Sequence, residues 1–387
     1  MAVKIDGTCN EKFRRVREVF AANFENDGEI GAAIAVTVDG APVLDLWGGH
    51  ADHARTRPWT RDTLVNVYST TKGLTAICAH RLVDQRKLDL DAAVARYWPE
   101  FAQAGKEKLP VRFLLSHQAG LPAVSKPLAS ETFYDWNAMC AALAEQKPWW
   151  EPGTRHGYHA ITYGWLVGEV IRRASGKTMG AYFRDEIAGP LGLDAHVGLD
   201  AKEDARVAEI VPAPPPPPDA PSEFAEMLKN PESMIARAIM NPPEVVLDPK
   251  VVNSRAFRAM ELPSANGHAT ARALARVYGA LARGGEIGGH RVLTPASIAR
   301  GHTEQAFGMD EVLRQPTRIG LGFMLSHAGA RLGPNPHSFG HPGAGGSLGF
   351  ADPGAKIGFG YAMNKMGVDA VMDPRTYRLI DAVYESL

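Results

Sequence analysis

The chain has 387 residues, 45% of them hydrophobic, which is enough for one large domain or two ordinary ones with a sizeable core. Its 42 basic and 43 acidic residues are well mixed and leave a formal net charge of −1, which argues against a nucleic-acid-binding stripe and against a polybasic membrane patch. We therefore expect a globular protein with a small-molecule partner, and neither nucleic acid nor a membrane as partner.

The N-terminus and the cysteines point to the cytoplasm. The first nine residues hold no apolar segment of the length of a signal peptide, and no later segment reaches transmembrane length without charge. Cys9, Cys78 and Cys140 are odd in number and widely spaced, so they predict neither a disulfide framework nor a metal site. We expect no metal and no cofactor.

The N-terminal part of the chain predicts a helix followed by antiparallel strands. Helical spacing of apolar residues covers 11–24, and strand-like runs at 31–38 and 42–47 flank an Asp-Gly dipeptide that is typical of a hairpin turn. A further strand-like run, 63–68, leads into an amphipathic segment.

The middle of the chain, from residue 70 to about 260, is predicted to be mostly helical. The clearest helices are expected at 70–85, 135–146 and 161–174. Within the Pro-rich stretch 212–221, five consecutive prolines predict a stiff polyproline II insertion at the surface, with partner docking as the alternative.

The last third returns to mixed structure. Its expected elements are a helix at 270–283, strands at 318–325, 347–351 and 356–363, and a terminal helix at 374–386. Both ends of the chain thus predict helix plus antiparallel strands. The predicted fold class is α/β (α+β): one antiparallel sheet flanked by the terminal helices, with an inserted all-helical domain.

The predicted domain boundaries follow from this pattern. Residues 1–69 and 265–387 would form one discontinuous α/β domain around a single sheet, and residues 70–264 the helical domain, including the Pro-rich insertion. Ser69 would then lie at the seam of the two domains, where clefts form.

Ser69-Thr70-Thr71-Lys72 is the one S-x-x-K sequence in the chain. A strand-to-helix junction presents Ser69 at a helix N-terminus, and a residue three positions along shares its helical face, so the Lys72 amine can reach the serine hydroxyl. Such an arrangement activates an otherwise inert alcohol. The plain alternative is an N-cap serine followed by a surface lysine.

A second serine, Ser347, lies in a G-x-S-x-G sequence that resembles a nucleophile elbow. An elbow needs a helix directly after the serine, whereas the residues that follow Ser347 include Pro353 and lead toward another strand. No histidine occurs after His341 to complete a triad. We interpret Ser347 as part of a Gly-rich strand or turn.

Three further motifs, in order along nearly the whole chain, resemble those of the serine β-lactamase and penicillin-binding-protein superfamily, most closely the class C β-lactamase-like family VIII carboxylesterases. They are LLSHQAGLP at 114–122, PGTRHGYHA at 152–160, where the lactamases carry a tyrosine-x-asparagine motif, and FGHPGAGG at 339–346, where they carry lysine-threonine-glycine.

The resemblance implies an acyl-enzyme mechanism. Ser69 would attack the substrate carbonyl, and Tyr158 would take the hydroxyl proton and return it to the leaving group, with Lys72 stabilising the ionised phenol. Whether Lys72 or Tyr158 is the formal base stays open. The N–H groups of Ser69 and of Ala344, the latter on an edge strand, would form the oxyanion hole, and His341 and Gly343 would contact substrate.

Two departures from the lactamase motifs indicate the substrate. Ala160 stands where the motif has asparagine, and His341-Pro342 replaces lysine-threonine, which removes the cation that would meet a β-lactam carboxylate. The resemblance therefore implies hydrolysis of short-chain or activated carboxylic esters, with weak β-lactamase activity at most.

Other readings remain open. Another acyl-transfer enzyme of the superfamily, such as a β-lactamase, a D-amino-acid peptidase, an amidase or an acyltransferase, would share these catalytic residues, and a non-catalytic scaffold of the same fold is the reading from a different class. Asn266 and His268 are weaker candidates for the cleft, and His337 with His341 does not make a convincing metal pair. The sequence does not predict an oligomeric state.

Overall fold

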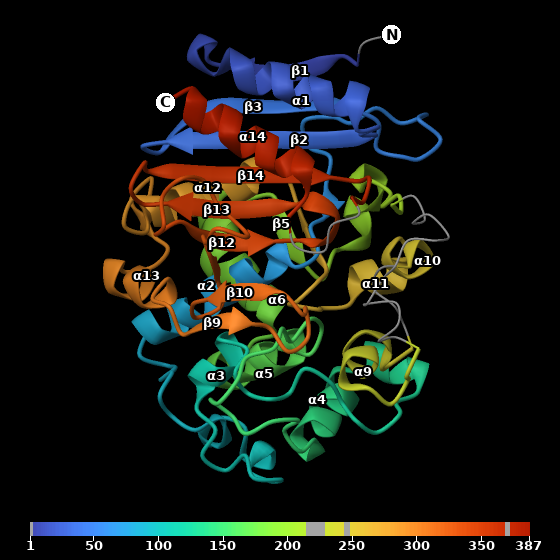
Figure 1. Cartoon of the computed structure of the whole chain (residues 1–387), viewed down its shortest axis with the longest axis vertical. Coiled ribbons are helices and arrows are strands. Elements are labelled where there is room, and N and C mark those ends of the chain that lie inside the picture. Colours follow the sequence, from blue (N-terminus) through green and yellow to red (C-terminus); the bar gives the residue numbers. More distant parts are fainter. Residues whose placement is uncertain (1–2, 214–228, 244–247, 368–371) are drawn as a thin grey trace.

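The computed structural model describes residues 3–213, 229–243, 248–367 and 372–387. Most of the predicted Pro-rich insertion therefore lies outside the described residues. The dominant feature is a nine-stranded antiparallel sheet whose strand order is β1-β3-β2-β14-β13-β12-β11-β10-β9 (Figure 1). The strands are β1 (Ile5–Cys9), β2 (Gly31–Val38), β3 (Ala41–Gly49), β9 (Ala306–Met309), β10 (Pro316–Ile319), β11 (Met324–Leu325), β12 (Phe339–Pro342), β13 (Leu348–Asp352) and β14 (Ile357–Met363).

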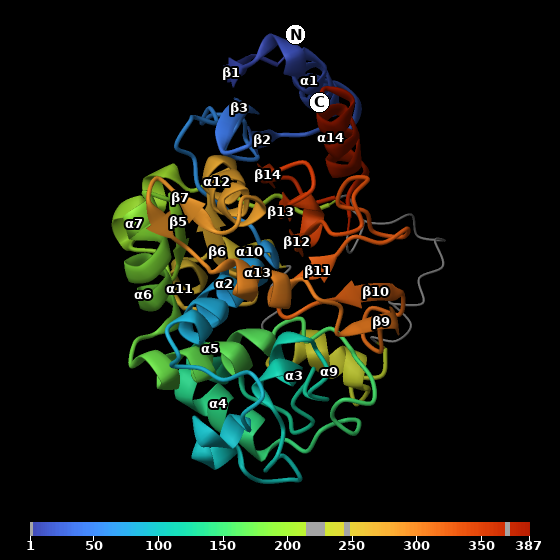
Figure 2. The same ribbon diagram turned by 90° about the vertical axis from the view of Figure 1, so that its left-hand side faces the viewer.

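Both ends of the chain build the centre of this sheet. β2 pairs with β14 over seven residues, from Ala32 opposite Met363 to Val38 opposite Ile357. Every residue of β14 is buried, because helices cover both of its faces. Figure 2 shows α1 (Arg14–Asn26) and α14 (Pro374–Glu385) on one face and α12 (Ala271–Ala282) on the other.

Glycines let α12 approach the sheet closely. A Cβ atom on Gly358 of β14 would lie 2.2 Å from the backbone nitrogen of Gly279 in α12, which no larger residue could tolerate. This contact fixes the sheet against the layer that contains α2 (Thr70–Asp84).

Four of the labelled helices, α3, α4, α5 and α9, lie below α2 in both Figures 1 and 2. Twelve of the fifteen residues of α2 are buried, so this helix is central and not amphipathic. The other α-helices are α3 (Val111–Leu115), α4 (Trp136–Glu145), α5 (Tyr163–Ser175), α6 (Met179–Phe183), α7 (Gly189–Leu191), α9 (Met234–Met240), α10 (Pro249–Val252), α11 (Arg255–Ala259) and α13 (Pro295–Gly301).

Short elements connect these parts. A three-stranded sheet of β4 (Val65–Asn66), β6 (Gly267–Ala269) and β5 (Ala195–Val197) lies beside the start of α2, and β7 (Glu286–Ile287) pairs with β8 (His290–Arg291). The 3₁₀ segments are Glu11–Phe13, Val94–Arg96, Pro99–Phe101, Ser130–Tyr134, Ala201–Arg206 and Ala344–Gly346, the last labelled η7, and Arg184–Ala188 is a π-helical turn.

The predicted fold class is confirmed, with the terminal helices on the sheet as expected. The sequence reasoning missed β1, β5, β6, β7, β8 and β9, gave no bounds for β12, and merged β10 and β11 into one strand. β5 pairs with β6, so a strand from the predicted helical region joins one from the predicted α/β region. The division of the chain into two domains stays a prediction.

Candidate active site

Ser69 lies at the N-cap of α2, directly after a strained residue. The preceding Tyr68 has φ +44°, a left-handed conformation that is unfavourable for a large side chain, and it is buried. Strain of this kind is concentrated at functional sites, where packing holds it in place. Ser69 itself is only partly buried, so its hydroxyl is presented at a turn.

Lys72 meets Ser69 as the sequence predicted. Its Nζ lies 3.2 Å from Ser69 Oγ and donates to the backbone carbonyls of Ala160, at 2.7 Å, and Ser264, at 2.9 Å. The side chain is fully buried. The described part of the chain places no carboxylate within 4.0 Å of this amine. The contacts of Lys72 are therefore neutral oxygens, which hold the amine without fixing its charge.

Tyr158 completes the group. Lys72 Nζ lies 4.6 Å from the centre of the Tyr158 ring, and the phenol is hydrogen-bonded to the Ser69 side chain. Tyr158 comes from the loop before α5, almost ninety residues from Ser69, yet it is buried against α2. The structure thus brings together all three predicted catalytic side chains.

Burial sets the charge of this group. It lowers the pKa of Lys72 far below the usual value of a lysine, and it raises the pKa of Tyr158, an effect opposed by the hydrogen bond from Ser69. The sequence reasoning expected a Lys72 ammonium to lower the pKa of the phenol. The direction is the reverse, because removal of both groups from water favours their neutral forms. Burial therefore shifts both groups toward their neutral forms, an amine and a phenol.

Two buried histidines support the Tyr158 loop. The backbone N–H of His159 donates to His117 Nδ1 at 3.1 Å, and His159 Nε2 accepts from the backbone of Leu121 at 3.0 Å. The His117 ring packs against Tyr158, with 5.0 Å between the ring centres. Burial lowers the pKa of both histidines, that of His159 to about 3, so they serve as neutral acceptors. The sequence flagged His117 and His159 only as members of longer motifs.

Ala344 lies in η7, directly after β12, and the expectation of an edge strand is wrong. β12 pairs with β13 on one side and with β11 on the other, because β9, β10 and β11 extend the sheet. However, β11 pairs only with Phe339 and Gly340, so β12 is bordered by β13 alone at the end that leads to Ala344. The oxyanion-hole role of the Ser69 and Ala344 N–H groups stays a prediction.

Gly343 and Ser347 join the η7 turn to the segment that carries Ser69. A Cβ atom on Gly343 would lie 2.2 Å from the carbonyl oxygen of Val67, so only glycine allows this approach. Ser347 Oγ donates to the same carbonyl at 2.8 Å and is buried. Ser347 is followed by β13, which confirms its interpretation as part of a Gly-rich turn.

His341 is buried beside Tyr158, with 6.0 Å between the ring centres. Its Nδ1 donates to the carbonyl of Pro342 at 2.7 Å, which leaves Nε2 as an acceptor, and burial lowers its pKa to about 3. A neutral imidazole therefore stands at the position of the lactamase cation. His337 is exposed, and the described residues contain no cluster of three or more side chains placed to hold a metal ion.

Asn266 lies behind the site, and its carbonyl is contacted at 2.9 Å by Nδ1 of the buried His268. Asn266 is fully buried, and its amide donates to the carbonyls of Phe257 and Met260, while its oxygen accepts from Leu262. These bonds shape the loop that presents the Ser264 carbonyl to Lys72.

A buried ion pair that the sequence did not reveal anchors η7 from the other side. Arg375, at the start of α14, donates to the carbonyl of Gly345 at 2.9 Å and pairs with Glu29 at 3.0 Å and with Asp373 at 2.9 Å. The neighbouring Thr376 hydroxyl donates to the carbonyl of Gly346 at 2.7 Å.

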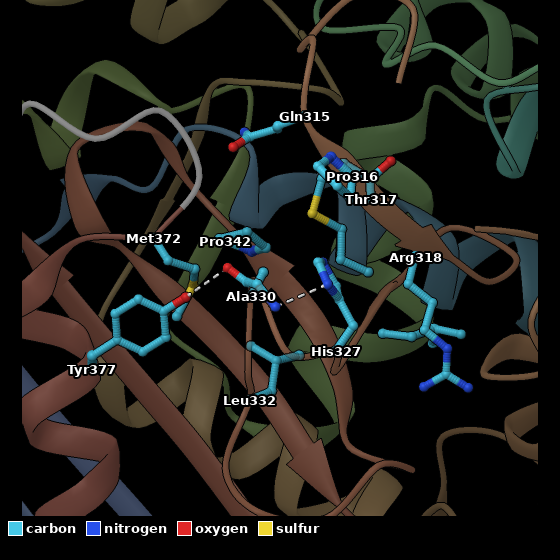
Figure 3. A pocket seen from close by; sticks show the side chains of 13 residues that line it. Gln315, Pro316, Thr317, Arg318, His327, Ala330, Leu332, Pro342, Met372 and Tyr377 are labelled. Atoms are coloured by element: carbon cyan, nitrogen blue, oxygen red, sulfur yellow. Dashed lines mark hydrogen bonds between the residues drawn. The ribbon is translucent and has the colours of Figure 1, made fainter. Parts of the chain in front are cut away.

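A cavity of about 230 Å³ lies beside Pro342, at the end of β12 (Figure 3). Its wall includes Pro342, next to Gly343, and Met324, which also packs in the apolar cluster around Tyr158. The remaining wall comes from β10, from the loop after β11 and from α14. It consists of Gln315, Pro316, Thr317, Arg318, Leu325, His327, Gly329, Ala330, Leu332, Met372 and Tyr377.

The family follows from comparison of the whole chain with known proteins. The family model described as Beta-lactamase matches residues 16–383. The chain belongs to the β-lactamase family. Among its relatives, Esterase/beta-lactamase LipL of Mycobacterium tuberculosis is 36% identical over 393 residues, which cover 95% of this chain and 85% of that protein.

Solved structures agree with this assignment to the β-lactamase family. A family VIII carboxylesterase is 44% identical, with a TM-score of 0.91 over 99% of this chain and 100% of that one. A penicillin-binding-protein homologue from Caulobacter crescentus is 43% identical, with a TM-score of 0.91 and the same coverage. The protein is a serine hydrolase of the β-lactamase family. The described helices include none that is both long and apolar enough to cross a membrane.

Proposed function

We propose that this protein is a carboxylesterase that hydrolyses short-chain or activated esters through an acyl-enzyme on Ser69. The observation that carries the proposal is the convergence of Ser69, Lys72 and Tyr158, with Lys72 Nζ 3.2 Å from the serine hydroxyl and buried without a carboxylate partner among the described residues. The names of LipL and of the family VIII carboxylesterase support ester substrates.

The directions of the pKa shifts suggest a proton path. Ser69 attacks the ester carbonyl while its proton passes to the neutral Lys72 amine, directly or through the Tyr158 hydroxyl. The N–H groups of Ser69 and Ala344 receive the developing oxyanion. On collapse, the Tyr158 hydroxyl protonates the leaving alkoxide and takes a proton from the Lys72 ammonium. Water repeats the sequence on the acyl-enzyme and releases the carboxylic acid.

The surroundings favour esters over β-lactams. His341 is neutral where a β-lactam carboxylate would need a cation, and Ala160 offers only its carbonyl, which already accepts from Lys72. Turnover of β-lactams is expected to be weak.

The buried thiols of Cys78 and Cys140 are free, as suits a cytoplasmic protein, which is the location we propose.

A panel of p-nitrophenyl esters of increasing acyl length tests the proposal, with nitrocefin and a D-amino-acid amide alongside. We expect turnover of the short esters, weak turnover of nitrocefin and no ester turnover by Ser69→Ala. Labelling with a fluorophosphonate probe is the companion measurement, with Ser347→Ala as the matched variant for the rival serine motif. Retained ester turnover in Ser69→Ala, or labelling that depends on Ser347 and not on Ser69, would refute the proposal.

A further inference from the structure

Asp310 stands out because it is a fully buried carboxylate that the catalytic group does not use. It follows β9, in the loop that leads to β10, and its side chain has no exposed surface. No Lys, Arg or His nitrogen of the described ranges lies within 4.0 Å of it, and its bonds come from neutral groups. A buried carboxylate without a cationic partner is energetically unfavourable, so the hydrogen bonds that Asp310 accepts are needed to stabilise it.

The Asp310 carboxylate accepts a hydrogen bond from the backbone of Tyr158. Oδ1 accepts from three backbone N–H groups, those of Tyr158 at 2.9 Å, Val312 at 2.8 Å and Leu313 at 2.9 Å. Oδ2 accepts from the Thr317 hydroxyl at 3.2 Å. The carboxylate thus ties the backbone of Tyr158 to the β9–β10 hairpin.

Two further hydrogen bonds join the Tyr158 loop to the β9–β10 hairpin. The Thr317 hydroxyl also contacts His156 Nε2 at 2.9 Å, and because that hydroxyl donates to Asp310, the imidazole is the donor. The backbone N–H of Glu311 donates to the carbonyl of His156 at 3.1 Å. The three residues from His156 to Tyr158 are therefore held by a loop 150 residues away in the sequence.

We infer that Asp310 is a positioning residue of the acyl-transfer site: its carboxylate fixes the backbone of Tyr158 and acts electrostatically on the phenol. The inference rests on the proposed function, because it assigns Asp310 a role only if Tyr158 transfers protons. No motif in the sequence points to this residue.

Among the described residues, few titratable groups besides Asp310 lie close to Tyr158. The titratable groups that face Tyr158 are Lys72 of α2, His117 after α3, Tyr163 of α5 and His341 of β12, in addition to Asp310. Burial keeps His117 and His341 neutral. Burial is the main cause that raises the pKa of Tyr158, and the charge of Asp310 adds to it.

The test is the pH profile of kcat/KM for a p-nitrophenyl ester with Asp310→Asn. The asparagine keeps an acceptor for the three N–H groups but removes the charge. We expect kcat/KM to fall about tenfold at neutral pH and the acid limb of the profile to move to lower pH by about one unit. The limb moves down because loss of a nearby negative charge makes every neighbouring proton easier to lose.

Matched variants separate charge from structure. Glu311→Gln removes a carboxylate one residue along, from a half-buried side chain that pairs with Arg155 and Arg314, so we expect an unshifted limb. Thr317→Val keeps the charge but removes one bond to it, and we expect kcat to fall about threefold with no shift of the limb. If Asp310→Asn does not fold by circular dichroism, Thr317→Val decides, and an unchanged kcat there overturns the inference.

An unshifted acid limb in folded Asp310→Asn overturns the inference, whatever the rate. If Ser69→Ala and Tyr158→Phe are inactive in the same series, the proposed function survives that result. Near-normal turnover by Tyr158→Phe would instead refute the assignment of Tyr158 and, with it, the role of Asp310.

Discussion

The start of α2 (here the α2 wall) and the η7 turn (the η7 wall) carry predicted site residues, and they are held by different kinds of contact. Lys72 of α2 is bound by two backbone carbonyls and a hydroxyl, all neutral. Arg375, behind η7, is bound by two carboxylates, those of Glu29 and Asp373. Both side chains are buried, yet only Arg375 has carboxylate partners that fix its charge.

The different partners of Lys72 and Arg375 fit different roles for the two side chains. A carboxylate beside Lys72 would stabilise the ammonium and block proton acceptance from Ser69, whereas neutral oxygens leave its pKa to be lowered by burial. Arg375 never needs to change charge, so carboxylates can hold it while it bonds the Gly345 carbonyl. The contacts of Lys72 allow its amine to gain and lose a proton, whereas the contacts of Arg375 hold the η7 turn in place.

The largest effect is expected for Lys72→Arg, because a guanidinium group does not lose its proton in proteins. If the working form of Lys72 is the neutral amine, kcat for ester hydrolysis should fall on the order of 10³-fold or more, as in Lys72→Met. Steady-state kinetics on p-nitrophenyl acetate, with folding checked by circular dichroism, makes the measurement. Substantial activity in Lys72→Arg would show that a fixed positive charge suffices.

Arg375→Met should chiefly affect stability. Removal of one partner leaves the Glu29 carboxylate buried without its cation, which costs about 3 to 5 kcal/mol of unfolding free energy. Urea denaturation followed by tryptophan fluorescence measures this loss. The double variant Glu29→Gln with Arg375→Met should recover part of it, and equal stability of the single and double variants would contradict an ion-pair role.

Acid should weaken the protein through its neutral buried histidines. Burial lowers the pKa of His159, His268 and His341 to about 3, whereas the unfolded chain titrates near the ordinary value. As pH falls below about 6.5 the unfolded state takes up protons that the folded state refuses, so stability is lost down to about pH 3. At pH 5 the loss is about 2 kcal/mol per histidine.

Unfolding free energies of His341→Asn and of His337→Asn at pH 7 and pH 5 test this. The substitution at the buried position should reduce the loss between the two pH values, and the exposed position should not change it. Equal pH dependence of the two variants would mean that His341 is not held neutral.

The smallest effect is expected at Thr376, whose hydroxyl bonds the Gly346 carbonyl. Thr376→Val keeps the shape but removes the bond, so we expect a loss of about 1 kcal/mol in transition-state stabilisation, seen as a lower kcat with KM nearly unchanged. Thr376→Ser restores a hydroxyl and should recover most of the rate. A rate in Thr376→Val equal to that of the wild type would show that η7 needs no anchor from α14.

The α2 wall could be predicted from sequence, because its chemistry is local. Ser69 and Lys72 are one helical turn apart, so a strand-to-helix junction and a three-residue spacing already place them together. The central strands β2, β3, β13 and β14 followed from periodicity and turn signals for the same reason. Tyr158 needed the family resemblance, since nothing near it in sequence indicates a partner.

The supports of the site could not be predicted, because each depends on a long-range contact. Asp310 reaches Tyr158 across 152 positions, and Arg375 reaches Glu29 across 346. A buried carboxylate or arginine looks like a surface residue until the fold covers it. The direction of the Tyr158 pKa shift was mistaken for the same reason, since burial of the amine and the phenol is a property of the packed molecule.

The account depends on a covalent intermediate on Ser69. The most direct measurement is mass spectrometry of the enzyme quenched during turnover of p-nitrophenyl acetate, with peptide mapping of any acylated residue. We predict one acetyl group on the peptide that contains Ser69, formed in wild-type enzyme and absent from Ser69→Ala. An acyl group on another residue, or ester turnover in Ser69→Ala with no acylated peptide, would contradict the account.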